Sequence, residues 1–251
     1  MANRYQAICQ DVAKLLERGD FERAANILAK YQDVRDTYIA QAYYRLYSDM
    51  RSHYYSEEKA IVRLDFLEKA KDQWGVIEKG RCLLEGELFQ RNTFMAEDLF
   101  NAAIRAGGPL IDHAKYYLGL IASNGLHSQG DENAPDLHFA KKMFSEVMGG
   151  TSKYKELARK EYCRTFLKEK EFSAEEHSQL FTHLYTLYDA DRKGGAELYS
   201  EYLLSSLESL GKELYSHKGA PSGLTQRAEF DARKNELRKA LVILRHTLQM
   251  S

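Results

Sequence analysis

The stretch of this chain that comes nearest to a nucleotide-binding motif is Gly75–Gly80. A P-loop has glycines at these two positions and continues with a lysine that binds phosphate and a serine or threonine that binds Mg²⁺. Arg81 and Cys82 follow here instead, so both chemical groups are missing. No strand pattern precedes the stretch, whereas a P-loop follows a β-strand. We therefore assign no phosphate binding to it.

The histidines and cysteines do not have the spacing of a metal site or of an activated nucleophile. Three histidines lie 14 and 11 residues apart, which fits neither one helix face nor a zinc finger. The 3 cysteines are far apart and have no nearby histidine partner, which favours buried thiols in a reducing compartment. We expect no metal, no cofactor and no enzyme activity. An all-α enzyme with a site assembled from distant residues is kept as an alternative. The residues concerned are His113, His127 and His138, and Cys9, Cys82 and Cys163.

The composition predicts a protein built of helices. There are only 3 prolines, and 31 leucines stand against 6 valines and 9 isoleucines, a balance that favours helix over sheet. The 36 Lys and Arg nearly cancel the 37 Asp and Glu, so no basic patch indicates nucleic acid. No apolar run approaches the roughly 18 residues of a membrane span, and no signal peptide is recognisable at the N-terminus. We therefore expect a cytoplasmic protein with no membrane span.

One small residue recurs along the chain at nearly constant intervals. The anchors are Ala24, Ala60, Ala96, Ala140 and, more weakly, His177, and the intervals between them are 36, 36, 44 and 37 residues. An apolar residue follows each anchor at i+4 and another at i+7, on the same helix face. The one long interval contains a polar turn over residues 124–135. The apolar pairs are Leu28 and Tyr31, Leu64 and Leu67, Phe100 and Ala103, Phe144 and Val147, and Phe181 and Leu184.

Each anchored helix is preceded by a second amphipathic helix, so the pattern predicts an all-α fold. The preceding helices are predicted at residues 5–18, 37–53, 76–90, 111–124 and 153–168. Residues 1–194 then form an α-solenoid of about five helix-turn-helix repeats. The period fails beyond residue 195, and residues 195–251 are predicted to form C-terminal capping helices, the last over residues 224–249. That last helix either caps the solenoid or forms an interaction element that dimerises or docks on a partner.

A helix-turn-helix repeat of about 36 residues resembles the tetratricopeptide-repeat superfamily, and the fourth unit is similar to its Sel-one-like branch. The resemblance covers about residues 5–190, and Gly119 is the one glycine that it places at a helix-packing position. The matching residues of the fourth unit are Ala114, Leu118, Gly119, Gly125, Asp136, Ala140, Phe144 and Gly150. The resemblance implies a concave groove lined by the first helix of each pair. It assigns to that groove Gln6, Arg45, Asp49, Arg81, Glu85, Tyr116, Asn124, Arg159 and Tyr162.

The resemblance implies a protein-protein interaction module that binds a protein or peptide segment, as an adaptor, scaffold or assembly factor. Tyrosine and arginine would serve as anchors, because both are enriched among residues that dominate binding energy. A groove for chaperone C-terminal carboxylates would need a Lys/Asn clamp where Cys9 and Ala13 stand, which disfavours that specialised role. The alternative is a secretion-type chaperone or regulator that forms a homodimer through its C-terminal helix.

Overall fold

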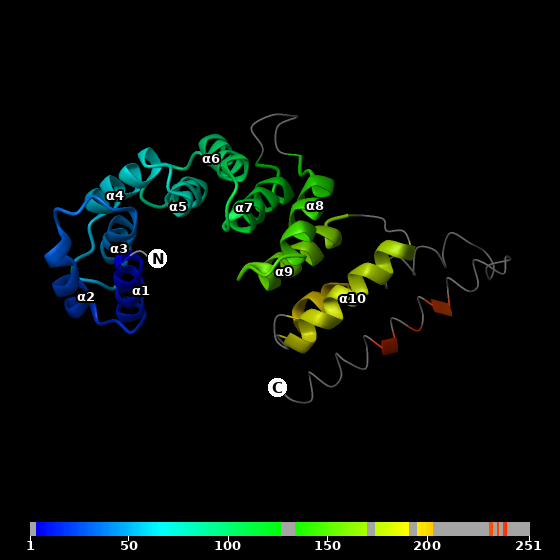
Figure 1. Ribbon diagram of the computed structural model, residues 1–251. Helices are drawn as coiled ribbons and strands as arrows, with labels where there is room; N and C mark the ends of the chain where they lie inside the picture. The colour runs from blue at the N-terminus through cyan, green and yellow to red at the C-terminus, as the bar shows by residue number, and fades with distance from the viewer. Residues whose placement is uncertain are drawn as a thin grey trace. The chain divides into compact units, whose positions relative to one another are not determined.

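The computed structural model describes residues 4–126, 134–169, 174–190 and 195–202, together with positions 231, 232, 235, 238 and 239. Among the described residues every regular element is a helix and none is a strand (Figure 1), which confirms the all-α prediction. The predicted last helix over residues 224–249 lies largely outside the described residues, as does the side chain of His177. No helix in the described part of the chain is long and apolar enough to cross a membrane.

The described chain divides into two compact units. The first comprises Met1–Ile121 with Gly125–Ala134, and the second comprises Ala122–Asn124 with Pro135–Ser251, as far as these ranges are described. The division falls inside the segment predicted as continuous repeats. The predicted boundary after residue 194 adjoins residues outside the description and stays a prediction.

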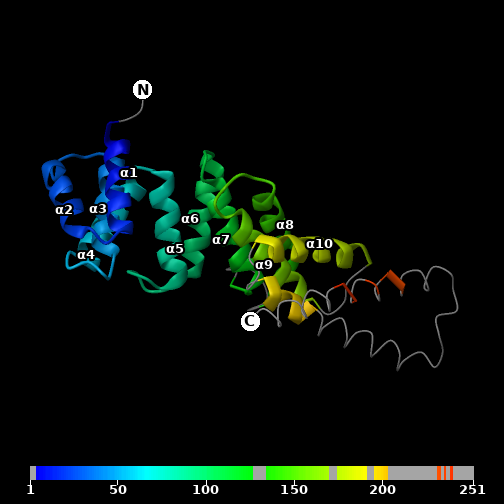
Figure 2. The ribbon, with the colours of Figure 1, turned by 90° about the horizontal axis from the view of Figure 1, so that it is seen from below.

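Consecutive helices of each unit pack against one another. In the first unit α1 contacts α3, α3 contacts α4, α4 contacts α5 and α5 contacts α6, and Figures 1 and 2 show these helices following one another in chain order. The first unit holds α1 (Arg4–Glu17), α2 (Phe21–Leu28) with the 3-10 turn η1 (Ala29–Tyr31), α3 (Thr37–Ser48), α4 (Glu57–Lys69), α5 (Gln73–Glu85), α6 (Thr93–Ala106) and most of α7 (Ile111–Ser123). The second unit holds α8 (Leu137–Met148), α9 (Lys155–Leu167), α10 (Ala174–Ala190) and helical residues 195–202.

The second helix of each of the first four predicted pairs begins with the same hydrogen bond. The N-cap side chain accepts from the backbone N–H three residues later, which satisfies one of the donors that a helix start leaves without an intrahelical partner. Each cap lies four residues before a predicted anchor. The interval does not depend on the caps, so their agreement confirms where these four second helices begin. The caps are Asp20, Ser56, Asn92 and Asp136.

The anchors are where the helices pack most closely. All four alanine anchors are 0% exposed, and so are the apolar residues four positions later. In the first predicted helix pair, the residue seven positions after the anchor is Tyr31. It is only partly buried, because α2 has already ended and the chain continues as η1. In α10 the buried stripe runs through Leu180, Leu184 and Leu187, and Phe181 is only partly buried. In the fifth predicted pair, Leu184 is therefore buried as predicted, whereas Phe181 is not fully buried.

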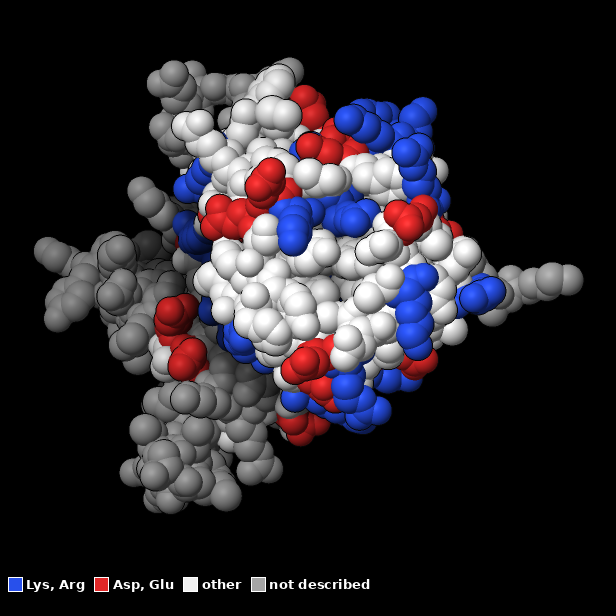
Figure 3. All heavy atoms as spheres, turned by 90° about the vertical axis from the view of Figure 1, so that its left-hand side faces the viewer, with Lys and Arg blue, Asp and Glu red and all other residues white. Residues whose placement is uncertain are grey.

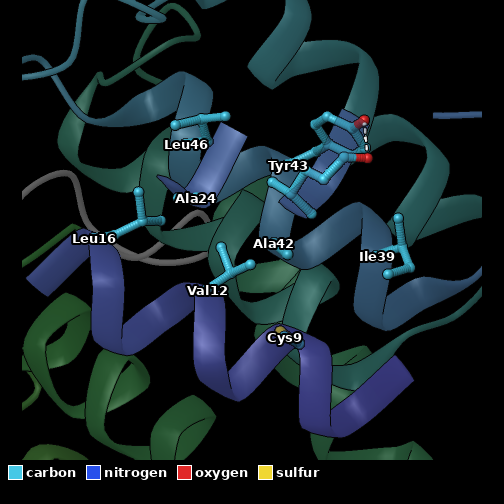
Figure 4. Packing of buried hydrophobic residues seen from close by; sticks show 9 residues of the cluster. Cys9, Val12, Leu16, Ala24, Ile39, Ala42, Tyr43 and Leu46 are labelled. Carbon is cyan, nitrogen blue, oxygen red and sulfur yellow. Dashed lines mark hydrogen bonds between the residues drawn. The ribbon is translucent and has the colours of Figure 1, made fainter. Parts of the chain in front are cut away.

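The core at the start of the first unit shows how the pairs are joined. Figure 4 shows the α1 side chains Cys9, Val12 and Leu16 pointing toward residues of α2 and α3. Burying an aliphatic side chain of this size contributes about 1.5–3 kcal/mol. The hydroxyl of Tyr43 donates to the carbonyl oxygen of Leu28 at 2.7 Å, so the buried phenol is also paired.

The first helix of the second pair and that of the third pair end or begin at other residues than predicted. The helix predicted over residues 37–53 ends at Ser48, because Asp49 takes the extended conformation with φ −82° and ψ 107°. The helix predicted over residues 76–90 begins three residues earlier, where the carboxylate of Asp72 accepts from the Gly75 N–H at 2.9 Å. It ends at Glu85, because Gly86 adopts the left-handed conformation with φ 78°, which glycine reaches at little steric cost.

The stretch Gly75–Gly80 lies inside α5 and has a packing role. A Cβ on Gly75 would stand 2.3 Å from the Cβ of Leu67, and a Cβ on Gly80 would stand 2.7 Å from Cε1 of Phe100. Both glycines therefore let α5 approach its neighbours α4 and α6. These two packing glycines lie outside the motif position that the resemblance assigns to Gly119.

Candidate functional site

One face of α5 carries a stripe of aromatic and charged residues. Trp74, Glu78, Arg81 and Glu85 follow one another at intervals of four, three and four residues, which places them on the same side of the helix. Trp74 is the only tryptophan of the chain. We call this surface the α3–α5 face. It consists of Tyr44 and Arg45 of α3, Trp74, Glu78, Arg81 and Glu85 of α5, and Glu87 just after α5.

Buried and partly buried polar contacts hold α3 and α5 together. The hydroxyl of Tyr44 donates to Glu78 Oε1 at 2.9 Å and lies 3.5 Å from Cys82 Sγ. Burial, reinforced by the negative charge of Glu78, raises the pKa of Tyr44 far above its usual value, so the phenol stays protonated. A second bridge runs from Gln41 Nε2 to the two carboxylate oxygens of Asp72, at 3.1 and 3.2 Å. These hydrogen bonds pair the polar groups of Gln41, Tyr44, Asp72 and Glu78, and they fix the two helices relative to each other.

The aromatic end of the face is centred on Trp74. Its indole meets the ring of Tyr44 edge-on, with centroids 5.5 Å apart, and the guanidinium of Arg45 lies 5.3 Å from the indole centroid. Trp74 and Arg45 are partly exposed, and Trp74 also packs on the buried cluster that includes Leu67. An aromatic pair and an exposed cation–π contact contribute about 0.5–1.5 kcal/mol each. A large, rigid and partly exposed aromatic group results.

The charged end of the face is centred on Arg81. Its guanidinium donates to Glu78 at 2.8 Å and to Glu87 at 2.7 Å, and it also pairs with Glu85. Burial lowers the pKa of Arg81, but the surrounding carboxylates outweigh it and the pKa lies above its usual value. Burial likewise raises the pKa of Glu85, against the opposing effect of Arg81. One cation is therefore shared by three anions.

The other groove residues predicted in the first unit are placed differently. Gln6 is partly buried on α1. Asp49 accepts from the backbone N–H of Arg51 at 3.0 Å and pairs with its guanidinium at 2.7 Å, and these hydrogen bonds lower the pKa of Asp49. Tyr116 is only 9% exposed and meets Tyr117 edge-on. It therefore does not offer the exposed ring that the resemblance implied.

The remaining predicted groove residues belong to the second unit. Asn124 accepts from the ammonium group of Lys168 at 3.1 Å. Arg159 pairs with Glu156 at 2.8 Å. Tyr162 is 8% exposed and its ring meets that of His183 edge-on, with centroids 5.1 Å apart, so it is a packing residue and not an exposed anchor. The α3–α5 face therefore contains only Arg45, Arg81 and Glu85 of the predicted set.

The three cysteine thiols are buried and do not have the properties of a nucleophile. Cys9, Cys82 and Cys163 are buried, and burial raises the pKa of Cys82 to about 11 and that of Cys163 to about 12. Both are therefore protonated at neutral pH, whereas a nucleophile has to be a thiolate. Within the described part of the chain no group of three or more His, Cys, Asp or Glu residues is arranged to hold a metal ion.

Sequence reasoning missed Trp74, Glu78 and Glu87 as members of this face. The signal for the first two was present, because Trp74 and Glu78 lie eleven and seven residues before Glu85 on one helical stripe. The resemblance assigns only one or two groove positions to each repeat, and Trp74 and Glu78 are not among them. Glu87 follows the left-handed Gly86, so helical spacing does not reach it.

The surface and the comparisons give the site its context. Figure 3 shows the first unit from the side on which α2 lies in Figure 1, with acidic and basic side chains interspersed around an uncharged area.

Comparison with family models, with curated proteins and with solved structures found no match to the chain. The α3–α5 face is therefore interpreted from its own geometry.

Proposed function

We propose that the chain is a non-enzymatic protein-interaction module that binds a protein or peptide segment through the α3–α5 face. It would serve as an adaptor, scaffold or assembly factor in the cytoplasm. The helix pairs would be stacked units of a tetratricopeptide-like α-solenoid, with the first helix of each pair carrying the binding surface. The observation that supports the proposal is the partly exposed pair of Arg45 and Trp74, which rests on the buried ring of Tyr44 and lies on two helices joined by hydrogen bonds.

Docking on this face would need little ordering of the chain. Tyr44 is held by Glu78, and Trp74 is held by Tyr44 and Arg45, so the aromatic surface is organised before a partner arrives. Preorganised anchors lose less conformational entropy on binding than mobile side chains do. Tryptophan, tyrosine and arginine are also the residue types enriched among binding hot spots. We therefore assign the anchoring contacts to Trp74 and Arg45.

Arg81 has a different role in this proposal. All of its guanidinium nitrogens donate to Glu78, Glu85, Glu87 or Cys82 within the chain. Arg81 therefore shapes the face by holding the acids in place, and reversing its charge would disturb the fold together with binding. A test of binding has to leave it unchanged.

The test is selection of random dodecapeptides, displayed on phage, against the immobilised full chain. The selected peptides should bind the double variant Arg45→Gln/Trp74→Phe about tenfold more weakly, because area and a cation–π contact are lost from the centre of the face. Val62→Ser is the matched control, since Val62 is 58% exposed on α4 and should bind the peptides normally. Circular dichroism shows whether each variant is folded. Peptides that bind the double variant as tightly as the original chain would refute the proposal.

A further inference from the structure

The charged end of the α3–α5 face holds more negative charge than the chain neutralises. Arg81 Nε and Nη2 donate to Glu78, Nη1 donates to Glu85 and Glu87, and Nη2 also donates to Cys82. A guanidinium has five N–H donors, and all five are used. The side chains of Glu85 and Glu87 are still 41% and 57% exposed. Two negative charges are thus left accessible beside a cation that can give no further hydrogen bond.

The position of these acids along α5 adds to the imbalance. Glu85 is the last residue of α5 and Glu87 follows Gly86, so both lie at the negative end of the helix macrodipole, where anions are disfavoured. The last turn of α5 contains no basic residue. Five other α-helices of the described chain place a cation there, whereas α2, α7, α8 and α10 do not. The five cations are Lys14 in α1, Arg45 in α3, Lys69 in α4, Arg105 in α6 and Arg164 in α9.

We propose that the segment bound by the α3–α5 face supplies the missing cation, as a lysine or arginine side chain that binds Glu85 and Glu87. The partner is thus a basic protein segment that also carries an apolar or aromatic residue for Trp74, several positions away from the cation, because Trp74 lies eleven residues or about 16 Å from Glu85 along α5. The inference rests on the proposed function and names the chemistry of its partner. Charge complementarity selects this occupant, because the uncompensated acids and the carbonyl end of α5 attract a cation and repel an acidic segment.

The same dodecapeptide selection on the full chain tests this inference. The selected peptides should be enriched in Lys or Arg, and their affinity should fall as salt is raised. The variant Glu85→Gln/Glu87→Gln should bind them about three- to tenfold more weakly, within the range expected for the loss of two exposed ion pairs. Glu57→Gln/Glu58→Gln removes the same charge from the first turn of α4 and should leave the affinity unchanged.

The melting temperatures of the free variants give a second measurement. Removing the acids at the end of α5 should lower the melting temperature less than removing Glu57 and Glu58 from a helix start, because the relief of two anions at the negative helix end offsets the loss of their ion pairs with Arg81. If the double variant at 85 and 87 does not fold, Glu87→Gln alone serves, since that side chain is the more exposed.

The outcomes separate the two proposals. Selected peptides that depend on Trp74 and Arg45 but contain no Lys or Arg would overturn this inference and leave the proposed function standing. Basic peptides that bind the Glu85→Gln/Glu87→Gln variant with unchanged affinity would also overturn this inference and leave the proposed function standing. A selection that yields no peptide dependent on Trp74 and Arg45 would overturn both.

Discussion

Replacing Gly75 by alanine should destabilise the first unit, although alanine is the better helix former. Alanine gains about 1 kcal/mol over glycine inside a helix. The new Cβ would stand 2.3 Å from the Cβ of Leu67, and neither atom can move without its backbone, so α4 and α5 have to separate. Overpacking of this kind costs about 1–3 kcal/mol and occasionally more. Because the contact is so short, we expect a net loss of about 2 kcal/mol, a factor of roughly 30 in the folding equilibrium.

Gly80→Ala is the internal comparison, because its obstacle is of another kind. The new Cβ would stand 2.7 Å from Cε1 of Phe100, and that ring is fully buried and stacked on Tyr117 with centroids 5.1 Å apart. The obstacle is therefore the far end of a side chain and can be removed. Phe100→Leu should make Gly80→Ala less harmful than it is alone. Leu67→Ala should give Gly75→Ala no such relief, since alanine keeps the Cβ.

Urea denaturation followed by circular dichroism and by the fluorescence of Trp74 measures these effects. The fluorescence reports on the first unit alone, because Trp74 is the only tryptophan and lies in α5. The reasoning is refuted if Gly75→Ala is as stable as the original chain or more stable. It is equally refuted if Leu67→Ala restores the loss.

Three further predictions concern caps, thiols and pH. Asn92→Ala removes the cap of α6 and should lower the free energy of unfolding by about 1 kcal/mol in thermal or urea melts; Asn92→Asp, which keeps an acceptor, should retain stability. Cys82 and Cys163 are buried with raised pKa values and should react with a thiol reagent at neutral pH only after unfolding; rapid labelling of the folded chain would contradict their burial. Burial and the charge of Arg159 lower the pKa of His183, so the unfolded chain binds its proton more readily and stability should fall as the pH drops below about 6.5. His183→Gln should show a smaller fall over the same range, and an identical pH profile would contradict this assignment.

Much of the helical framework could be predicted from the sequence, because it depends on local patterns. An alanine anchor with an apolar residue four positions later marks the buried stripe of a second helix, and the cap four positions before it marks the helix start. Helix ends were less accessible. Asp49 leaves the helix through a conformation stabilised by Arg51, and nothing in the hydrophobic period announces that contact.

The candidate site was harder to predict, because it depends on contacts between helices. A groove position transferred through a repeat says which side of a helix a residue occupies but not what covers it. Tyr116 and Tyr162 occupy such positions and are buried, whereas Arg81 is committed to three carboxylates. The helical stripe of α5 indicates the side that Trp74 occupies, but not its contacts with Tyr44 and Arg45 of a different helix. The packing glycine Gly75 was likewise recognisable only from its distance to Leu67.

The emission of Trp74 tests most directly whether partners bind the α3–α5 face. The full chain is titrated with a selected peptide that itself contains no tryptophan, while binding is followed independently by calorimetry. The proposed site predicts a saturable blue shift of the emission with the same dissociation constant as the calorimetric titration, because the partly exposed indole is taken out of water. Tight calorimetric binding with unchanged Trp74 emission would place the binding surface elsewhere and contradict the proposed function.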